Sequence, residues 1–167
     1  MNVHHLCDIP RDTGYSNACH ICGVPLDAGY FDVADIKPAP QAGQEVEVAR
    51  YELHSQYCGT LLYFAQYAEQ VTPPQLPQQV TSKTPGYEWI ILCNNQPRAP
   101  YLPTNLILNP WGYNALPIHL RLEEGCMLRF VVRRVAPTVR LELSQVGGRL
   151  LGRSWYNTSY GGVPNRL

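Results

Sequence analysis

The sequence predicts a mainly β protein, built as an antiparallel β-sandwich. The chain of 167 residues holds 15 Pro, 13 Gly and 11 Tyr. Pro and Gly interrupt short elements and Tyr favours strands. Apolar and polar side chains also alternate with a period of two over several segments, which is typical of half-buried strands. A single chain of this length can bury a substantial core.

The clearest alternation lies in residues 115–135. Two runs of alternating apolar residues are separated by Glu124-Gly125. This pattern predicts two strands that form either a hairpin or a corner between two sheets. The second run places apolar side chains on one face and an Arg-rich face on the other: Leu128, Phe130 and Val132 against Met127, Arg129, Val131 and Arg133.

Upstream of this pair, three strands are predicted. Residues 44–54 alternate in polarity. Residues 57–70 permit an amphipathic helix, but we prefer a strand because Tyr is abundant there and the surroundings are β. The apolar run 86–93 predicts a strand that ends at Asn94-Asn95, a pair suited to a tight turn.

Shorter segments complete the expected architecture. Residues 71–85 carry four Pro and predict a long surface loop, which is either a passive connector or a contact with other subunits. Residues 106–108 and 138–143 predict two more strands. Gly147-Gly148 predicts a bulge or a sharp bend.

The domain organisation is expected to be an extended N-terminal arm over 1–43, followed by a β-sandwich domain over 44–167. The arm holds three of the six Cys and three of the five His. It ends in a Pro-rich stretch over 36–43, which is typical of a stiff connector. We therefore expect little regular structure before residue 44.

A Cys/His cluster in the arm is the strongest candidate for chemistry. His4, Cys7, Cys19 and Cys22 could supply four ligands to a structural zinc ion, with the last two in a Cys-x-x-Cys knuckle. His5 is adjacent to the first ligand. The order His-His-x-Cys differs from that of well-formed zinc pairs, so two alternatives stay open.

The first alternative is reduced thiols that pack as small hydrophobic groups. The second is a disulfide, either Cys7 to Cys22 or Cys19 to Cys22, formed after release from the cell. The first residues show no signal-peptide pattern, so we expect synthesis in a reducing cytoplasm. In that compartment Cys58, Cys93 and Cys126 are expected to be buried thiols.

Charge is unevenly distributed along the chain. Residues 1–70 hold nine acids and three basic residues, and the remainder holds four acids and ten basic residues. This asymmetry indicates either contacts between oppositely charged subunits or complementary halves of one domain. Neither a Lys-rich patch nor a nucleic-acid-binding motif is present, and no apolar run reaches the roughly 20 residues of a membrane span. We expect no nucleic-acid or membrane partner.

Catalytic motifs are missing from the sequence. It contains no Gly-x-Ser-x-Gly, no phosphate-binding Gly loop and no His-Glu-x-x-His. Glu123 and Glu124 are adjacent, so in a strand they would point to opposite faces. We therefore expect a protein that is not an enzyme, with no catalytic residues and no cofactor apart from the zinc alternative.

Several features together resemble small jelly-roll-type virion proteins of tailed bacteriophages, such as capsid decoration proteins. They are the strands joined by Pro-rich loops, the turn at 122–125, the run LRFVVRR and the closing segment GGRLLGRSWYN. The resemblance covers roughly residues 44–160. It implies a virion location and contacts with other virion subunits, such as a major capsid protein, through the arm, the Pro-rich loop and the Arg-rich face.

The irregular arm and the uneven charge predict a homo-oligomer, most simply a trimer. A second functional class is a carbohydrate-binding β-sandwich module. In that case Trp155, Tyr156 and Tyr160 would form a platform on which sugar rings stack.

Overall fold

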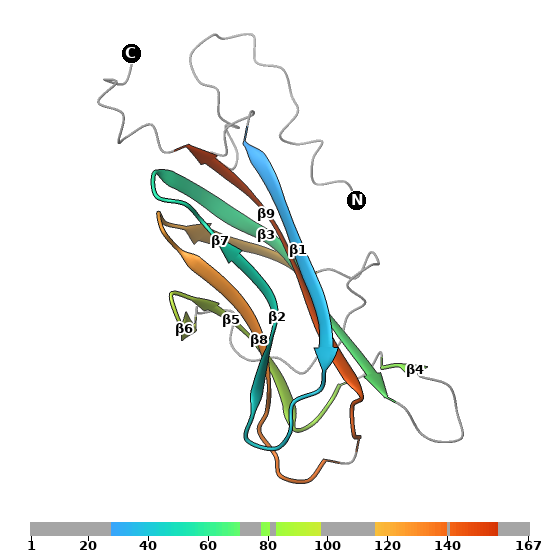
Figure 1. Cartoon of the computed structure of the whole chain (residues 1–167). Coiled ribbons are helices and arrows are strands. Elements are labelled where there is room, and N and C mark those ends of the chain that lie inside the picture. The colour runs from blue at the N-terminus through green and yellow to red at the C-terminus, as the bar shows by residue number, and fades with distance from the viewer. Residues whose placement is uncertain (1–27, 71–77, 81–82, 98–115, 140, 157–167) are drawn as a thin grey trace, which may run out of the picture.

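The structure, a computed structural model, describes residues 28–70, 78–80, 83–97, 116–139 and 141–156. These residues form nine β-strands and contain no helix (Figure 1). The prediction of a mainly β protein is confirmed. The strands are β1 (Gly29–Pro38), β2 (Glu45–Glu52), β3 (Tyr57–Gln70), β4 (Gln78–Gln79), β5 (Tyr87–Cys93), β6 (Gln96–Pro97), β7 (Leu116–Leu122), β8 (Met127–Arg134) and β9 (Gln145–Tyr156).

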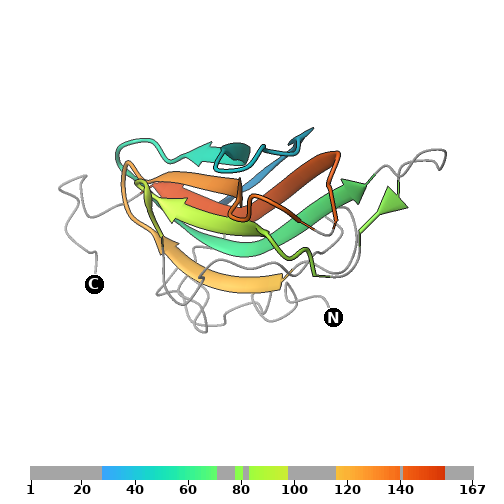
Figure 2. The same ribbon diagram turned by 90° about the horizontal axis from the view of Figure 1, so that it is seen from below.

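The strands form two antiparallel sheets, as expected of a β-sandwich. One sheet has the order β1-β9-β3-β4, with β7 paired to β3 as a fifth strand, and the other has the order β2-β8-β5-β6. In Figures 1 and 2, β3 and β9 run side by side over most of their length, in agreement with their pairing from Tyr57 to Glu69.

The pairing of the strands is nested along the chain. When the two-residue strand β4 is set aside, the first strand pairs with the last, the second with the seventh, the third with the sixth and the fourth with the fifth. These four pairs are β1–β9, β2–β8, β3–β7 and β5–β6. The chain is therefore wound as one long antiparallel hairpin that has been folded over into two layers.

The upstream strand predictions are confirmed by β2, β3 and β5. Residues 57–70 form one continuous strand, so the helical alternative is wrong. The turn after β5 is also confirmed, because Asn94 and Asn95 have φ values of 51° and 63°. Asn is among the few residues that adopt such values readily.

The segment 115–135 forms a corner between the two sheets rather than a hairpin. β7 pairs with β3, whereas β8 pairs with β2 and β5. Gly125 lies between them with a φ of 62°, which suits glycine. The predicted faces of β8 are confirmed, since Leu128, Phe130 and Val132 are fully buried in the core.

The prediction of an irregular arm is wrong for residues 29–38. They form β1, which pairs with β9 from Gly29 opposite Ser154 to Pro38 opposite Gln145. The prolines at the end of this segment suggested a connector, but a proline is tolerated on an edge strand because one side of such a strand makes no ladder. The remainder of the arm before Ala28, with His4, Cys7, Cys19 and Cys22, lies outside the described residues.

Two predictions near the C-terminus are also wrong. Residues 139 and 141–144 are irregular, and the strand begins only at Gln145. Gly147 and Gly148 do not bend the chain but lie within the 12-residue strand β9. Gly148 is small for a packing reason, because a Cβ there would overlap the ring of Phe130. The predicted strand at 106–108 lies outside the described residues.

The core lies between the two sheets and is mostly apolar. Trp89 and Phe130 of one sheet pack with Leu61 and Leu150 of the other, and each is at most 1% exposed. The rings of Phe64 and Phe130 meet edge to face across the sandwich, with centroids 5.9 Å apart. No helix long and apolar enough to cross a membrane occurs in the described part of the chain.

Candidate functional site

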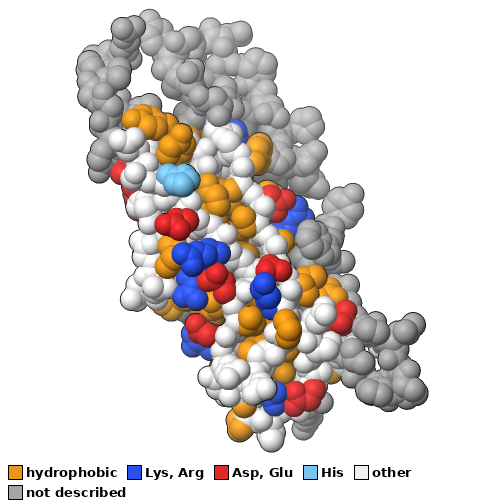
Figure 3. Space-filling view, in the orientation of Figure 1, with side chains coloured by type: hydrophobic (Ala, Val, Ile, Leu, Met, Phe, Trp, Pro, Cys, Tyr) orange, Lys and Arg blue, Asp and Glu red, His pale blue; other side chains and the backbone are white. Residues whose placement is uncertain are grey.

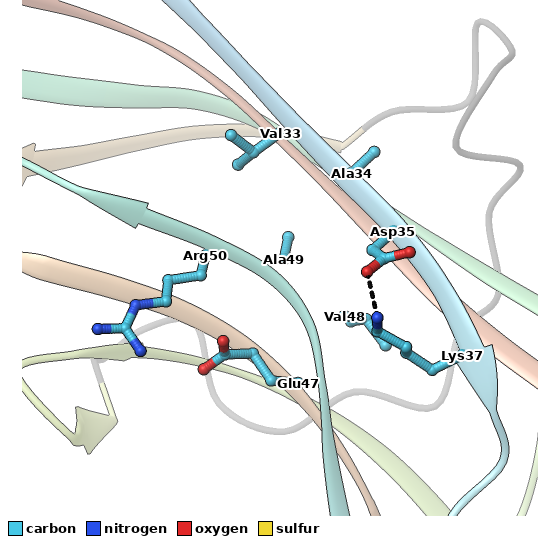
Figure 4. A pocket seen from close by; sticks show the side chains of 8 residues that line it. All are labelled: Val33, Ala34, Asp35, Lys37, Glu47, Val48, Ala49 and Arg50. Atoms are coloured by element: carbon cyan, nitrogen blue, oxygen red, sulfur yellow. Dashed lines mark ion pairs between the residues drawn. The ribbon is translucent and has the colours of Figure 1, made fainter.

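A groove lies where the edges of the two sheets part. It has a volume of about 280 Å³ and runs between β1 and β2, which end their respective sheets. We call it the β1–β2 groove (Figure 4). It is lined by Val33, Ala34, Asp35 and Lys37 of β1 and by Glu47, Val48, Ala49 and Arg50 of β2.

The alternation of β1 places two charged side chains on the core side of the sheet. Asp35 lies opposite Gly148 in β9, and Lys37 lies opposite Val146, which is fully buried in the core. Residues directly opposite in antiparallel strands share a face. At this edge the sheets have separated, so the two charges reach the groove instead of the apolar interior.

Asp35 is held by two donors. Its carboxylate accepts the backbone N–H of Ile36 at 2.8 Å and forms an ion pair of 2.6 Å with Lys37. The bond from Lys37, followed by the bond from the Ile36 amide, lowers the pKa of Asp35 below its usual range. The carboxylate therefore stays ionised at neutral pH, on a strand that carries its own counter-ion.

The β2 side of the groove is shaped by a bulge between Glu47 and Ala49. The bulge turns both Val48 and Ala49 inward, where they are 0% and 5% exposed. Glu47 stays on the outer face and accepts a 2.5 Å bond from Arg129 of β8. The guanidinium Nη2 of Arg50 lies 3.7 Å from the carboxylate Oε2 of Glu52. The groove thus has a small apolar floor and a rim of charges that are already paired.

An aromatic stack closes the contact between β1 and β2 away from their connecting loop. The rings of Phe31 and Tyr51 are stacked with centroids 3.9 Å apart. The Tyr51 hydroxyl donates to the hydroxyl of Ser154 in β9 at 3.1 Å. These contacts join the edge of one sheet to the other sheet, so β1 is held firmly although nothing described pairs with its outer side.

The backbone of β1 presents alternate groups to that outer side. The N–H of Ala39 donates to the carbonyl of Ser144 at 3.1 Å, so odd-numbered residues exchange hydrogen bonds with β9. The N–H and C=O groups of Asp32, Ala34 and Ile36 then point away from β9. The bond from the Ile36 amide to Asp35 agrees with this direction.

The acidic first part of the sequence and the basic second part form ion pairs with each other within the chain. Acids from the first 70 residues pair with arginines from the remainder: Glu47 with Arg129, Glu45 with Arg133 and Asp32 with Arg149. On the face seen in Figure 3, basic side chains lie beside acidic ones. Of the two explanations for the asymmetry, the structure supports complementary halves of one domain.

Cysteines outside the arm behave differently from the prediction. Cys93 and Cys126 are buried as predicted, but they are joined as a disulfide between the end of β5 and the residue just before β8, so their prediction as reduced thiols is wrong. The pairing depends on the corner that brings residue 126 beside residue 93, which sequence spacing does not reveal. Cys58 is a free thiol, and partial burial raises its pKa. Its half-buried position differs from the expected full burial.

The predicted zinc ligands His4, Cys7, Cys19 and Cys22 all lie outside the described residues, so the zinc proposal stays a prediction. Among the residues that are described, no group of three or more His, Cys, Asp or Glu side chains could hold a metal ion.

The predicted sugar platform does not form as expected. Trp155 and Tyr156 are consecutive in β9, so their side chains point to opposite faces of the sheet. Tyr160 lies outside the described residues. Tyr156 instead meets Tyr57 of β3 edge to face, with centroids 5.7 Å apart.

Sequence reasoning missed Asp35 and Lys37 as site residues because it assigned them to the arm. An available signal was the run from Gly29 to Lys37, which is free of proline and contains aromatic and β-branched residues. No protein-family model matches the chain, and neither any curated protein nor any solved structure matches it.

Proposed function

We propose that the chain is a non-enzymatic structural subunit of a virus particle, with a jelly-roll fold, that binds other virion subunits such as a major capsid protein. The nested strand pairing is the observation that carries this proposal. Eight strands wound into two packed sheets define the jelly roll, a fold that forms viral capsid domains as well as lectin domains and cupins.

The interior of the sandwich favours a structural role within this group. Bulky apolar side chains from both sheets fill the space between them, and the Trp89 indole N–H crosses it to donate to the Gly147 carbonyl at 3.0 Å. A filled interior gives a stable support rather than a ligand chamber. Binding then falls to the edges and ends of the sandwich.

The expected virion location and the contacts through the arm and the Pro-rich loop are parts of the same proposal. The Arg-rich face contributes less than the sequence suggested. Arg129 is closely paired with Glu47 of the same subunit and Arg133 lies 3.8 Å from Glu45, so these acids of the same subunit compete with an acidic partner for both arginines. The homo-oligomer and its symmetry stay predictions at this point.

A carbohydrate-binding module is a second candidate, supported by exposed aromatic side chains at one end of the sandwich. Tyr57 and Tyr156 are 40% and 43% exposed, and their rings touch. Exposed aromatic rings of this kind can stack on sugars. Tyr57 and Tyr156 are therefore the candidate sugar-stacking residues, in place of the predicted set of Trp155, Tyr156 and Tyr160.

Pelleting with shells assembled from the major capsid protein of the same genome tests the first proposal. The full chain should sediment with the shells to a saturating ratio. The double variant Tyr57→Ser, Tyr156→Ser removes the aromatic pair of the carbohydrate alternative. Under the particle proposal it should still bind the shells as the wild type does. Absence of the chain from the shell pellet, together with glycan-array binding that this double variant loses, would overturn the particle proposal in favour of the carbohydrate module.

A further inference from the structure

Among the described strands, β1 leaves its outer side unpaired as a sheet edge. β1 ends the five-stranded sheet, and no described strand covers its other side. The backbone groups of Asp32, Ala34 and Ile36 point there, as the hydrogen bond from Ala39 to Ser144 establishes. Another strand could pair at this edge with the usual spacing of about 4.8 Å.

The same edge carries features that discourage an arbitrary strand. Asp35 and Lys37 point towards the core side of the sheet beside the groove, and Pro38 offers no N–H. Inward-pointing charges and proline are recognised protections of a sheet edge. A strand that places opposite charges against these residues escapes the penalty, so the edge is selective rather than closed.

The sequence of β1 itself meets that requirement in one antiparallel register. When two copies of β1 are centred on Ile36, Asp35 of each copy lies directly opposite Lys37 of the other. A register centred on Asp35 places two acids opposite each other, and one centred on Lys37 places two lysines opposite each other. Opposite charges across a strand pair stabilise it, whereas like charges destabilise it.

We propose that two copies of the chain pair through β1, antiparallel and centred on Ile36, and thereby join their five-stranded sheets into one continuous sheet. The contact is isologous, since each copy contributes the same edge. It concerns self-association and holds independently of the function proposed above.

Dimer formation changes the partners of the Ile36 amide and the Asp35 carboxylate at the centre of the interface. In the single chain the Ile36 amide donates to the Asp35 carboxylate at 2.8 Å. In the dimer this amide donates to the Ile36 carbonyl of the second copy, and the carboxylate instead receives Lys37 of the second copy. On the outer face Ile36 packs against Ile36, and Ala34 against Pro38, so the half-buried Ile36 side chain loses further exposed surface.

Sedimentation velocity of the full chain over a range of concentrations measures the proposed dimer. Ala34→Pro removes an N–H that points away from β9, so it should weaken the dimer about tenfold or more while the β1–β9 ladder is kept. Ala34→Val keeps the N–H and is the matched control. It should dimerise like the wild type.

Substitutions that change the charges of Asp35 and Lys37 test the register and leave the backbone hydrogen-bonding groups unchanged. Lys37→Glu alone should weaken the dimer about tenfold, because it sets acid against acid. Asp35→Lys combined with Lys37→Asp should restore it, because opposite charges again face each other. Circular dichroism and melting temperature establish that each variant is folded.

Cross-linking gives an independent measure of the register. Ile36→Cys should form a reducible dimer under mild oxidation, because its Cα lies about 5.5 Å from that of the second copy in a hydrogen-bonded pair. Ala34→Cys should not, because four residues of offset separate the two cysteines by about 13 Å.

A wild type that stays monomeric at all concentrations overturns the proposal, as does a trimer. A dimer that Ala34→Pro and Lys37→Glu both leave unchanged, with both variants folded, overturns it too. Equal cross-linking of Ile36→Cys and Ala34→Cys would contradict the register.

Discussion

The ring of Phe31 occupies the space that a side chain at Gly152 would need. Phe31 lies on β1 and Gly152 lies opposite it on β9, more than a hundred positions later in the sequence. A Cβ built on Gly152 would overlap this ring and also the backbone carbonyl of Thr60 on β3. The close approach of three strands therefore depends on the missing side chain.

Gly152→Ala is expected to lower the free energy of unfolding by about 1–3 kcal/mol, the usual cost of overpacking. Urea denaturation of the full chain measures it. Gly29→Ala is the matched control on β1, since its Cβ would meet no atom closer than 3.7 Å. Equal stability of the two variants would contradict the packing argument.

Gln66→Met is expected to stabilise the protein by about 1–3 kcal/mol. Gln66 is 0% exposed on the core side of β3, and neither atom of its carboxamide has a hydrogen-bond partner among the described residues. A side chain of similar size without polar atoms removes this desolvation cost. Gln145→Met, at an exposed position, should change stability by less than about 0.5 kcal/mol. A loss of stability in Gln66→Met would show that the carboxamide is satisfied in solution.

The ion pair between Asp32 and Arg149 predicts a dependence of stability on pH. The two side chains meet through bonds of 2.7 and 2.5 Å. The bond from Arg149 lowers the pKa of Asp32 below its ordinary value of 3.8. Because the folded pKa is depressed, the contribution is complete well above pH 3.8 and is lost as the pH falls through the lower folded value.

Asp32→Asn should therefore lower the melting temperature at neutral pH and have a shrinking effect below about pH 4. The pair is partly exposed, so its contribution is expected to be at most about 1 kcal/mol. Calorimetry of both proteins between about pH 2 and 7, a range that spans the titration of an aspartate, measures the difference in melting temperature. An effect that is the same at every pH would mean that the carboxylate charge plays no part.

The Cys93–Cys126 disulfide closes a segment with a sequence separation of 33. Cys126→Ala, or reduction with a thiol, is expected to lower the free energy of unfolding by about 2–4 kcal/mol through the entropy of the unfolded chain. Denaturation with and without reductant measures this, and alkylation followed by mass spectrometry locates the bond. Cys58→Ser serves as the control, because Cys58 is a free thiol. Alkylation of both Cys93 and Cys126 without prior reduction would exclude the bond.

The zinc prediction for the arm is tested by metal analysis. If His4, Cys7, Cys19 and Cys22 bind zinc, purified full chain should carry about one metal ion, and Cys19→Ser with Cys22→Ser should abolish it. Cys58→Ser should leave the metal content unchanged. A folded, metal-free wild type would exclude the site, and a mass increase on reduction and alkylation at these residues would indicate a disulfide in its place.

The sequence by itself determined the fold class and the faces of single strands. Alternation alone placed Leu128, Phe130 and Val132 in the core, because side chains in a strand change face at every residue whatever the strand pairs with. It likewise indicated the turn at Asn94-Asn95, since a tight turn is a local property of the backbone.

Only the tertiary structure decided which strands pair and where the site lies. The segment 29–38 is a strand because β9 supplies its hydrogen bonds, with Gly29 opposite Ser154, and no local pattern contains that partner. The charges follow the same rule. Asp32 meets Arg149 through this pairing, and Asp35 reaches a groove that exists only because two sheet edges separate beside it. Contacts between distant segments depend on the packing of whole sheets, and the period of one strand carries no information about them.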